Sequence, residues 1–163
     1  EFCSKAEKCF KEFDFIEKEL QAFESLKNID SIRTSVTNLF DSVQKKEKEV
    51  FETIIKQFSD FFRDFDSTDI VLELDFENIE EEAGKINKND YILAPEKTVT
   101  HWSRPDERIP AKYDNTKIAQ EKLRRFKALA FKEARSQRDQ LLPQIKMKVD
   151  NMRNKIFSEI KNI

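Results

Sequence analysis

Apolar residues in the first part of the chain recur at the spacing of helices that pack side by side. The steps between them alternate between four and three positions, at Phe2, Ala6, Cys9, Phe13, Ile16, Leu20 and Phe23. This alternation places the residues along one side of an α-helix, as in a coiled-coil heptad. The pattern therefore predicts a helix that buries this side against another helix.

The spacing shifts near residues 27–31 and then continues. It resumes through Leu26, Ile29, Ile32, Val36, Leu39 and Val43, and after a polar run through Phe51, Ile55, Phe58, Phe62 and Phe65. Phe58, Phe61, Phe62 and Phe65 fall on one helical face, with charged residues on the other. Residues 28–31, Asn-Ile-Asp-Ser, can end one helix and cap the next, but no Gly or Pro forces a turn. The pattern thus fits both one long helix over residues 2–65 and a helical hairpin.

Residues 69–102 carry a different period. Ile70, Leu72, Leu74 and Phe76 occupy every second position, which predicts a half-buried strand. Residues 91–94 and 98–102 are weaker strand candidates around Pro95. A small antiparallel sheet accounts for all three stretches, and an extended segment lying along the helices fits as well. Residues 78–84 are expected to form a helical turn that ends at Gly84, and residues 103–112, with two prolines and five charges, a surface loop.

The last third of the chain is again helical in pattern. A helix is expected from about Asp114 to Leu142, and Pro143 is expected to kink or end it. The apolar positions of this helix and of a following one are Ala119, Leu123, Phe126 and Ala130, then Ile145, Val149, Met152, Ile156, Ile160 and Ile163. We therefore predict a mainly α fold: an elongated helical bundle or coiled coil with a small extended or β insertion at about residues 69–102.

Composition supports this prediction and suggests one module. One glycine and four prolines in 163 residues cannot supply the tight turns of a β-sandwich or barrel. The length suits a single domain. We expect a helical module over residues 1–163, with an acidic helical region (1–66), a strand and loop insertion (67–112) and a basic helical region (113–163). Because both ends lie close to helical patterns and no initiator Met is present, we expect the chain to be a fragment of a larger protein.

The net charge of −2 conceals a strong polarity. Residues 1–82 carry a net charge of −11 and residues 112–163 a net charge of +8. In one interpretation the acidic and basic helices pair with each other, within the chain or between chains. In the other, the basic helices contact phosphate groups of RNA, DNA or an anionic membrane surface. Six cations of the last third of the chain fall within an arc of about 160° on a helix and form a basic face, with Phe131 expected to be exposed among them. They are Arg124, Arg125, Lys127, Lys132, Arg135 and Arg138.

Residues suited to catalysis or to cofactor binding are scarce. His101 is the only imidazole, and one glycine cannot build a phosphate-binding loop. Cys3 and Cys9 are separated by six residues, which on a helix excludes a disulfide between them, so we expect free thiols in or near a core. Adjacent carboxylates in the run 80–82 diverge by 100°, which disfavours a metal site. We expect no enzyme activity, cofactor, metal or small-molecule substrate. Free thiols favour an intracellular, cytoplasmic location.

A stretch of apolar and acidic positions over residues 32–54 resembles a known family. Ile32, Val36, Leu39-Phe40-Asp41, Val43, Glu47, Val50-Phe51 and Ile54 are similar to the coiled coil that follows the B-box zinc fingers of tripartite-motif (RBCC) proteins. The resemblance implies a long antiparallel dimer that spaces other domains.

These patterns favour a non-catalytic helical scaffold, a protein–protein interaction module that dimerises or docks into a larger assembly. The alternatives are a nucleic-acid-binding or ribonucleoprotein subunit that uses the basic face, and a helical bundle that binds a membrane surface. The residues expected to act as packing anchors are Phe13, Ile16, Leu20, Phe51, Ile55, Phe58, Phe62 and Phe65.

Overall fold

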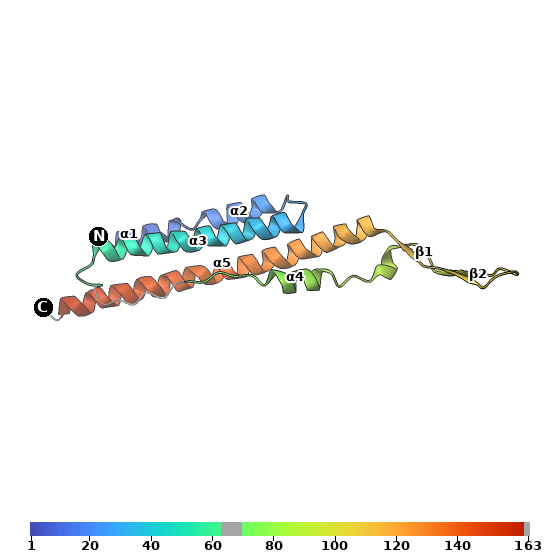
Figure 1. Cartoon of the computed structure of the whole chain (residues 1–163). Helices are drawn as coiled ribbons and strands as arrows, with labels where there is room; N and C mark the ends of the chain where they lie inside the picture. Colours follow the sequence, from blue (N-terminus) through green and yellow to red (C-terminus); the bar gives the residue numbers. More distant parts are fainter. Residues whose placement is uncertain (63–69, 162–163) are drawn as a thin grey trace. The chain divides into compact units, whose positions relative to one another are not determined.

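The computed structural model describes residues 1–62 and 70–161. The fold is mainly α with a small antiparallel strand insertion, as predicted (Figure 1). The chain divides into two compact units: unit 1 comprises residues 1–74 and 130–163, and unit 2 comprises residues 75–129. The elements are α1 (Phe2–Lys11), α2 (Phe15–Phe23), α3 (Ile29–Gln57), α4 (Phe76–Ala83), η1 (Lys88–Tyr91), β1 (Ile92–Ala94), β2 (Lys97–Val99), β3 (Glu107–Ile109), β4 (Lys112–Tyr113) and α5 (Asn115–Lys161).

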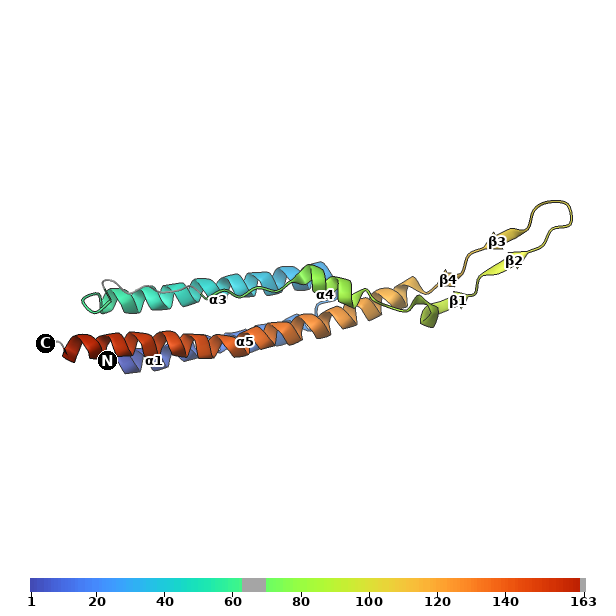
Figure 2. The same cartoon turned by 90° about the horizontal axis from the view of Figure 1, so that it is seen from below.

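Unit 1 is a helical bundle in which the first part of the chain folds back on itself. In Figure 2, α1 and α2 run antiparallel to α3 and to residues 130–161 of α5. The hairpin therefore replaces the single long helix that the pattern also allowed. Asn28 is the N-cap of α3, and its side chain accepts hydrogen bonds from the backbone N–H groups of Asp30 (2.7 Å) and Ser31 (3.3 Å). This capping begins the returning helix without glycine or proline.

A second interruption separates α1 from α2 at residues 12–14, where the sequence predicts continuous helix. There the backbone N–H groups of Glu12, Phe13 and Asp14 donate to carbonyls three residues earlier, each at 3.3 Å. A tightened turn of this kind changes the helical phase only slightly. Phe13 and Ile16 consequently remain buried on the same side of the bundle.

The core of unit 1 contains much of the predicted apolar seams, together with residues that the seams did not include: Phe40, Ile54, Phe131, Ala134 and Leu141. The core residues of the helices and of the turn at residues 12–14 are almost completely buried: Ala6, Cys9, Phe13, Ile16, Leu20, Ile32, Val36, Leu39, Phe40, Val43, Phe51, Ile54, Ala130, Phe131, Ala134, Leu141, Ile145, Val149 and Met152. The helix α3 ends at Gln57, however, with Phe58 as its C-cap. The expectation that Phe58, Phe61 and Phe62 continue one helical face is therefore wrong, because the backbone has left the helix there. Phe65 lies outside the described residues.

Residues 70–74 are extended but are not part of a sheet. Ile70, Leu72 and Leu74 are buried, whereas Val71 and Glu73 are exposed, so the predicted alternation holds. The backbone of this segment is bonded by helix side chains. Gln44 of α3 donates to the carbonyl of Leu72 (3.3 Å), and Gln137 of α5 accepts from the N–H of Glu73 (2.9 Å) and donates to its carbonyl. The predicted strand is thus an extended segment lying along the helices.

The helix α5 contributes residues to both units and continues through Pro143. Of the two predicted effects of Pro143, a kink or an end, the second is therefore wrong: the helix that begins near Asp114 does not end at Leu142, and no separate helix follows. Proline lacks one donor, but the surrounding turns supply their own hydrogen bonds, and Leu141 and Ile145 on either side of it are buried in unit 1.

In unit 2, α4 packs against the first part of α5. The rings of Phe76 and Phe126 stack at 6.3 Å, and Ile79 and Ala83 are buried beside them. Gly84 is the C-cap of α4, as the sequence predicted for this position. Arg125 of α5 donates to the carbonyl of Lys85 (2.6 Å), just beyond this cap.

A β-hairpin forms the rest of unit 2. β1 pairs with β4, and β2 pairs with β3, in each case antiparallel. The two weaker strand candidates correspond to β1 and β2. The expectation of a loop over residues 103–112 is wrong in part, because β3 and the first residue of β4 lie within it. Backbone pairing stabilises these strands although none of their residues is buried.

Candidate interaction surfaces

The predicted packing anchors are largely inside unit 1. Phe13, Ile16, Leu20, Phe51 and Phe62 are buried, whereas Ile55 and Phe58 are half-buried. Phe58 meets the ring of Phe2 edge-on, at 5.7 Å between ring centres, and Phe62 lies 6.4 Å from the same ring. Since the chain covers these aromatic side chains itself, they are not an open surface for a partner.

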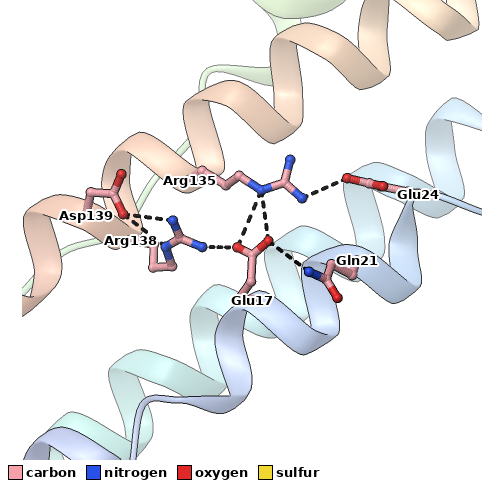
Figure 3. A network of polar contacts seen from close by, with 6 residues as sticks. All are labelled: Glu17, Gln21, Glu24, Arg135, Arg138 and Asp139. Carbon is pink, nitrogen blue, oxygen red and sulfur yellow. Dashed lines mark hydrogen bonds and ion pairs between the residues drawn. The ribbon is translucent and has the colours of Figure 1, made fainter.

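Two arginines of the predicted basic face contact the acidic helix α2. Arg135 lies 3.2 Å from one carboxylate oxygen of Glu17 and 2.7 Å from Glu24, and Arg138 also donates to Glu17 (Figure 3). Glu17 lies between the two guanidinium groups in Figure 3. The interpretation that acidic and basic helices pair within the chain therefore applies to these two residues.

Phe131 belongs to the same side of α5 as these arginines. It lies four residues before Arg135 and is buried, with an exposed fraction of 4%. The expectation of an exposed aromatic among the cations is therefore wrong. This side of α5 faces α2 rather than solvent, because Phe131 packs in the core while Arg135 and Arg138 reach the carboxylates of α2.

The members of the basic face in unit 2 also have acidic neighbours. Arg124 and Arg125 both donate to Glu121, at 2.5 Å and 3.0 Å. Their hydrogen bonds hold the pKa of the Glu121 carboxyl well below its usual range, at about 2. Lys127 is half-buried, and Lys132, in unit 1, is exposed. The six cations thus do not form one free phosphate-binding surface.

A charged pair that the sequence did not indicate lies inside unit 1. Glu47 is the one buried charged residue among those described, with an exposed fraction of 1%, and it is paired with Lys148. The ammonium of Lys148 also lies 4.4 Å from the ring centre of Phe51. The second carboxylate oxygen of Glu47 is buried and has no hydrogen-bond partner among the described residues. Glu47 sits within a run of polar residues, so its hydropathy pattern gave no reason to place it inside.

The two thiols occupy different environments. Cys9 is buried, and Cys3 is exposed rather than packed in or near the core. Burial raises the pKa of the Cys9 thiol to about 11, and the carboxylates of Glu12 and Glu47 add to this effect. A thiol with so high a pKa is a poor nucleophile at neutral pH.

The polar residues considered for catalysis or metal binding do not assemble into a site. Nε2 of His101 lies 3.2 Å from a guanidinium nitrogen of Arg104 and 3.3 Å from a carboxylate oxygen of Glu107. Glu82 pairs with Lys85, and Glu80 with Lys122 at 3.3 Å. Over residues 1–62 and 70–161, no three His, Cys, Asp or Glu side chains come together as metal ligands would.

The β-hairpin presents apolar side chains to solvent. Trp102, in the connection between β2 and β3, has an exposed fraction of 99%, and Leu93 in β1 has one of 68%. None of the residues in β1 to β4 is buried. In unit 1, the exposed large apolar residues are Val71, Leu142, Met147, Phe157 and Ile160.

Unit 1 also has a shallow groove between α2 and α3, which we call the α2–α3 groove. It encloses about 380 Å³ and is lined by Phe15, Phe23 and Leu39, with Glu19, Asn38 and Ser42 among its polar residues. A second hollow, of about 450 Å³, lies between α1 and α3 and is lined mainly by polar and charged residues. The α2–α3 groove is the more aromatic of the two.

Comparisons with known proteins leave the family open. No family model, curated protein or solved structure matches the chain. The resemblance to tripartite-motif coiled coils stays a prediction; its residues 32–54 lie within α3, whose apolar side is buried in unit 1. None of the helices in the described residues has an apolar stretch long enough to cross a membrane.

Proposed function

We propose that the chain is a non-catalytic helical module that binds protein surfaces and acts as a scaffold. The observation that carries this proposal is the β-hairpin of unit 2, which leaves Trp102 almost wholly and Leu93 largely in solvent. Tryptophan is highly buried on average in folded proteins, so an indole that lies in solvent is unusual. Tryptophan is also enriched among the residues that dominate binding energy at protein interfaces.

The stability of the hairpin supports the same proposal. A two-stranded ribbon is marginal in water unless a helix or a further strand covers it. The strands β1 to β4 contain no buried residue, so nothing among the described residues covers the apolar side chains of the ribbon. A partner surface that covers the ribbon would supply the missing burial.

The charged contacts favour a protein partner over a nucleic acid or a membrane. Nucleic-acid binding requires cations that are free to approach phosphates. Four of the six residues of the basic face already contact carboxylates: Arg124, Arg125, Arg135 and Arg138. Replacing these contacts by phosphate would exchange one anion for another and gain little.

Site-specific photocrosslinking in the cells that produce the protein tests the proposal. A benzoylphenylalanine is placed at Trp102 or Leu93, and at Gln120, an exposed polar position of α5, as the matched control. We expect discrete crosslinked protein species from the hairpin positions, absent from the control. Equal crosslinking at all three positions, or no adduct at Trp102 or Leu93, would contradict a docking role for the hairpin.

A further inference from the structure

Trp102 is the only tryptophan of the chain, and its exposed fraction is 99%. Tryptophan is among the side chains with the largest apolar surface and is highly buried on average. A contact that covers Trp102 would therefore bury a large area through a single side chain. The position of this residue between β2 and β3 leaves all sides of the indole ring accessible.

The edges of the hairpin are poorly suited to adding another strand. Pro95 and Pro110 interrupt the hairpin between its two ladders, and Lys97 and Arg108 are exposed on the strands. Prolines and charged side chains at strand edges prevent pairing with further strands. Contact through the side chain of Trp102 is therefore favoured over contact through the backbone.

The charges near Trp102 do not suit a phosphate-rich partner. The hairpin residues 92–113 carry four cationic and three anionic side chains, a net charge of +1 apart from His101. Arg108 is paired with Glu96, and His101 lies between Arg104 and Glu107. A polyanion or an anionic bilayer would require several unpaired cations on one side.

The α2–α3 groove has the properties that would accommodate Trp102. Its volume of about 380 Å³ falls within the roughly 300–1,000 Å³ of typical ligand pockets. Phe15 and Phe23 line the groove, and contacts between aromatic rings are favourable. Glu19, at the groove, is opposite in charge to Arg104, which follows Trp102 by two positions.

We propose that Trp102 of one copy inserts into the α2–α3 groove of a second copy, a proposal that rests on the proposed function and specifies its partner. Arg104 approaches Glu19 of the second copy in this contact. Because the two contacting surfaces differ, the association is heterologous. In a pair of copies, the copy that inserts its Trp102 keeps a free groove, and the other copy keeps a free Trp102. Copies therefore add head to tail.

Two variants, each of which removes one side of the contact, test this proposal. Trp102→Ala removes the inserted side chain, and Asn38→Arg places a long cation at the groove, where it fills space and repels Arg104. Both positions are exposed, and thermal unfolding checks that each variant folds. Ser42→Arg is a second groove variant should Asn38→Arg fail to fold. Thr98→Ala, at an exposed polar position of the same hairpin, is the matched control.

Sedimentation velocity and tryptophan fluorescence supply the readouts. We expect the wild type and Thr98→Ala to self-associate with increasing concentration, and each of the two test variants to associate at least about 30-fold more weakly, as for an interface hot spot. A mixture of the two variants should form a 1:1 complex. Because Trp102→Ala has no tryptophan, adding it to Asn38→Arg should shift the emission of the single indole to shorter wavelength.

Several outcomes would overturn the proposal. They are a wild type that stays monomeric up to about 1 mM, a mixture of variants with unchanged emission, and a blue-shifted emission that does not change on dilution. If these occur while the photocrosslinks identify a different protein, the proposed function stands and only the choice of a second copy fails. If the crosslinks are absent as well, both fail.

Discussion

Extended backbone occurs in both units of the chain, with opposite surroundings. In unit 1, residues 70–74 bury every second side chain and bond to glutamines of α3 and α5. In unit 2, the strands of the hairpin bond to each other, and none of their residues is buried. An alternating apolar pattern therefore indicates that every second side chain is buried against some surface, and that the segment need not belong to a sheet. Strands can pair through their backbones without such a pattern.

Ion pairs show the same contrast. Glu47 and Lys148 in unit 1 have side-chain exposed fractions of 1% and 10%, whereas Glu96 and Arg108 in the hairpin have 45% and 79%. Burial makes the first pair expensive to break, and solvent makes the second nearly neutral. Matched substitutions in the two units can therefore test how far the contrast extends.

The largest effect is expected for Lys148→Ala. This change leaves the buried carboxylate of Glu47 without its cation, and loss of one partner of a buried pair costs about 3–5 kcal/mol in the free energy of unfolding. Urea denaturation measures the change. The double variant Glu47→Leu with Lys148→Met should recover most of the loss, because apolar replacements remove both charges. A double variant as unstable as Lys148→Ala would show that packing, not charge, explains the effect.

The next effect compares two leucines in extended backbone. Leu72→Ala should lower the free energy of unfolding by about 2–4 kcal/mol, because it opens a cavity beside the helices. Leu93→Ala, whose side chain is mostly in solvent, should change it by less than about 0.5 kcal/mol. The same denaturation experiment measures both variants. Similar losses in the two would mean that Leu93 is also covered.

A smaller effect is expected for Gln137→Ala. This substitution removes both hydrogen bonds to the backbone of Glu73, and we expect a loss of about 1 kcal/mol in the free energy of unfolding because water can replace part of them. Hydrogen exchange of the Glu73 amide should become faster. Gln140→Ala, on an exposed side of α5, is the control and should leave this exchange unchanged.

The smallest effect is expected for Arg108→Ala. Its pair with Glu96 is exposed, so the free energy of unfolding should change by less than about 0.5 kcal/mol. Chemical denaturation at low and at high salt measures this change. A loss above about 1 kcal/mol at low salt would indicate that the hairpin depends on this pair for its own order.

Much of unit 1 could be predicted from residue spacing. The seam from Phe2 to Phe23 and the cap at Asn28 both appear in the structure, because heptad spacing and capping chemistry act locally. The break at residues 12–14 could not be predicted, since bonds to carbonyls three residues earlier preserve the seam. The end of α3 at Gln57 was missed for a related reason: the phenylalanines keep helical spacing after the backbone has left the helix.

For the basic face, residue spacing did not predict which part of the protein the cations contact. A helical wheel places Phe131, Arg135 and Arg138 on one side of α5 but does not say which surface lies opposite. The charge polarity of the chain was the available indication, and it favoured pairing with the acidic helices. For Glu47 no such indication existed, because its burial depends on Lys148, which lies about a hundred positions later in the chain.

Gln137 holds the carbonyl and N–H of residue 73, atoms that every amino acid except proline provides. These two hydrogen bonds therefore depend very little on which side chain is present at position 73. Substitutions of Glu73 by residues other than proline are therefore expected to keep both hydrogen bonds, whereas substitutions of Gln137 are expected to remove them. Relatives of this chain are therefore better sought by the glutamine of α5 and the alternate apolar positions 70, 72 and 74 than by the identity of the segment as a whole.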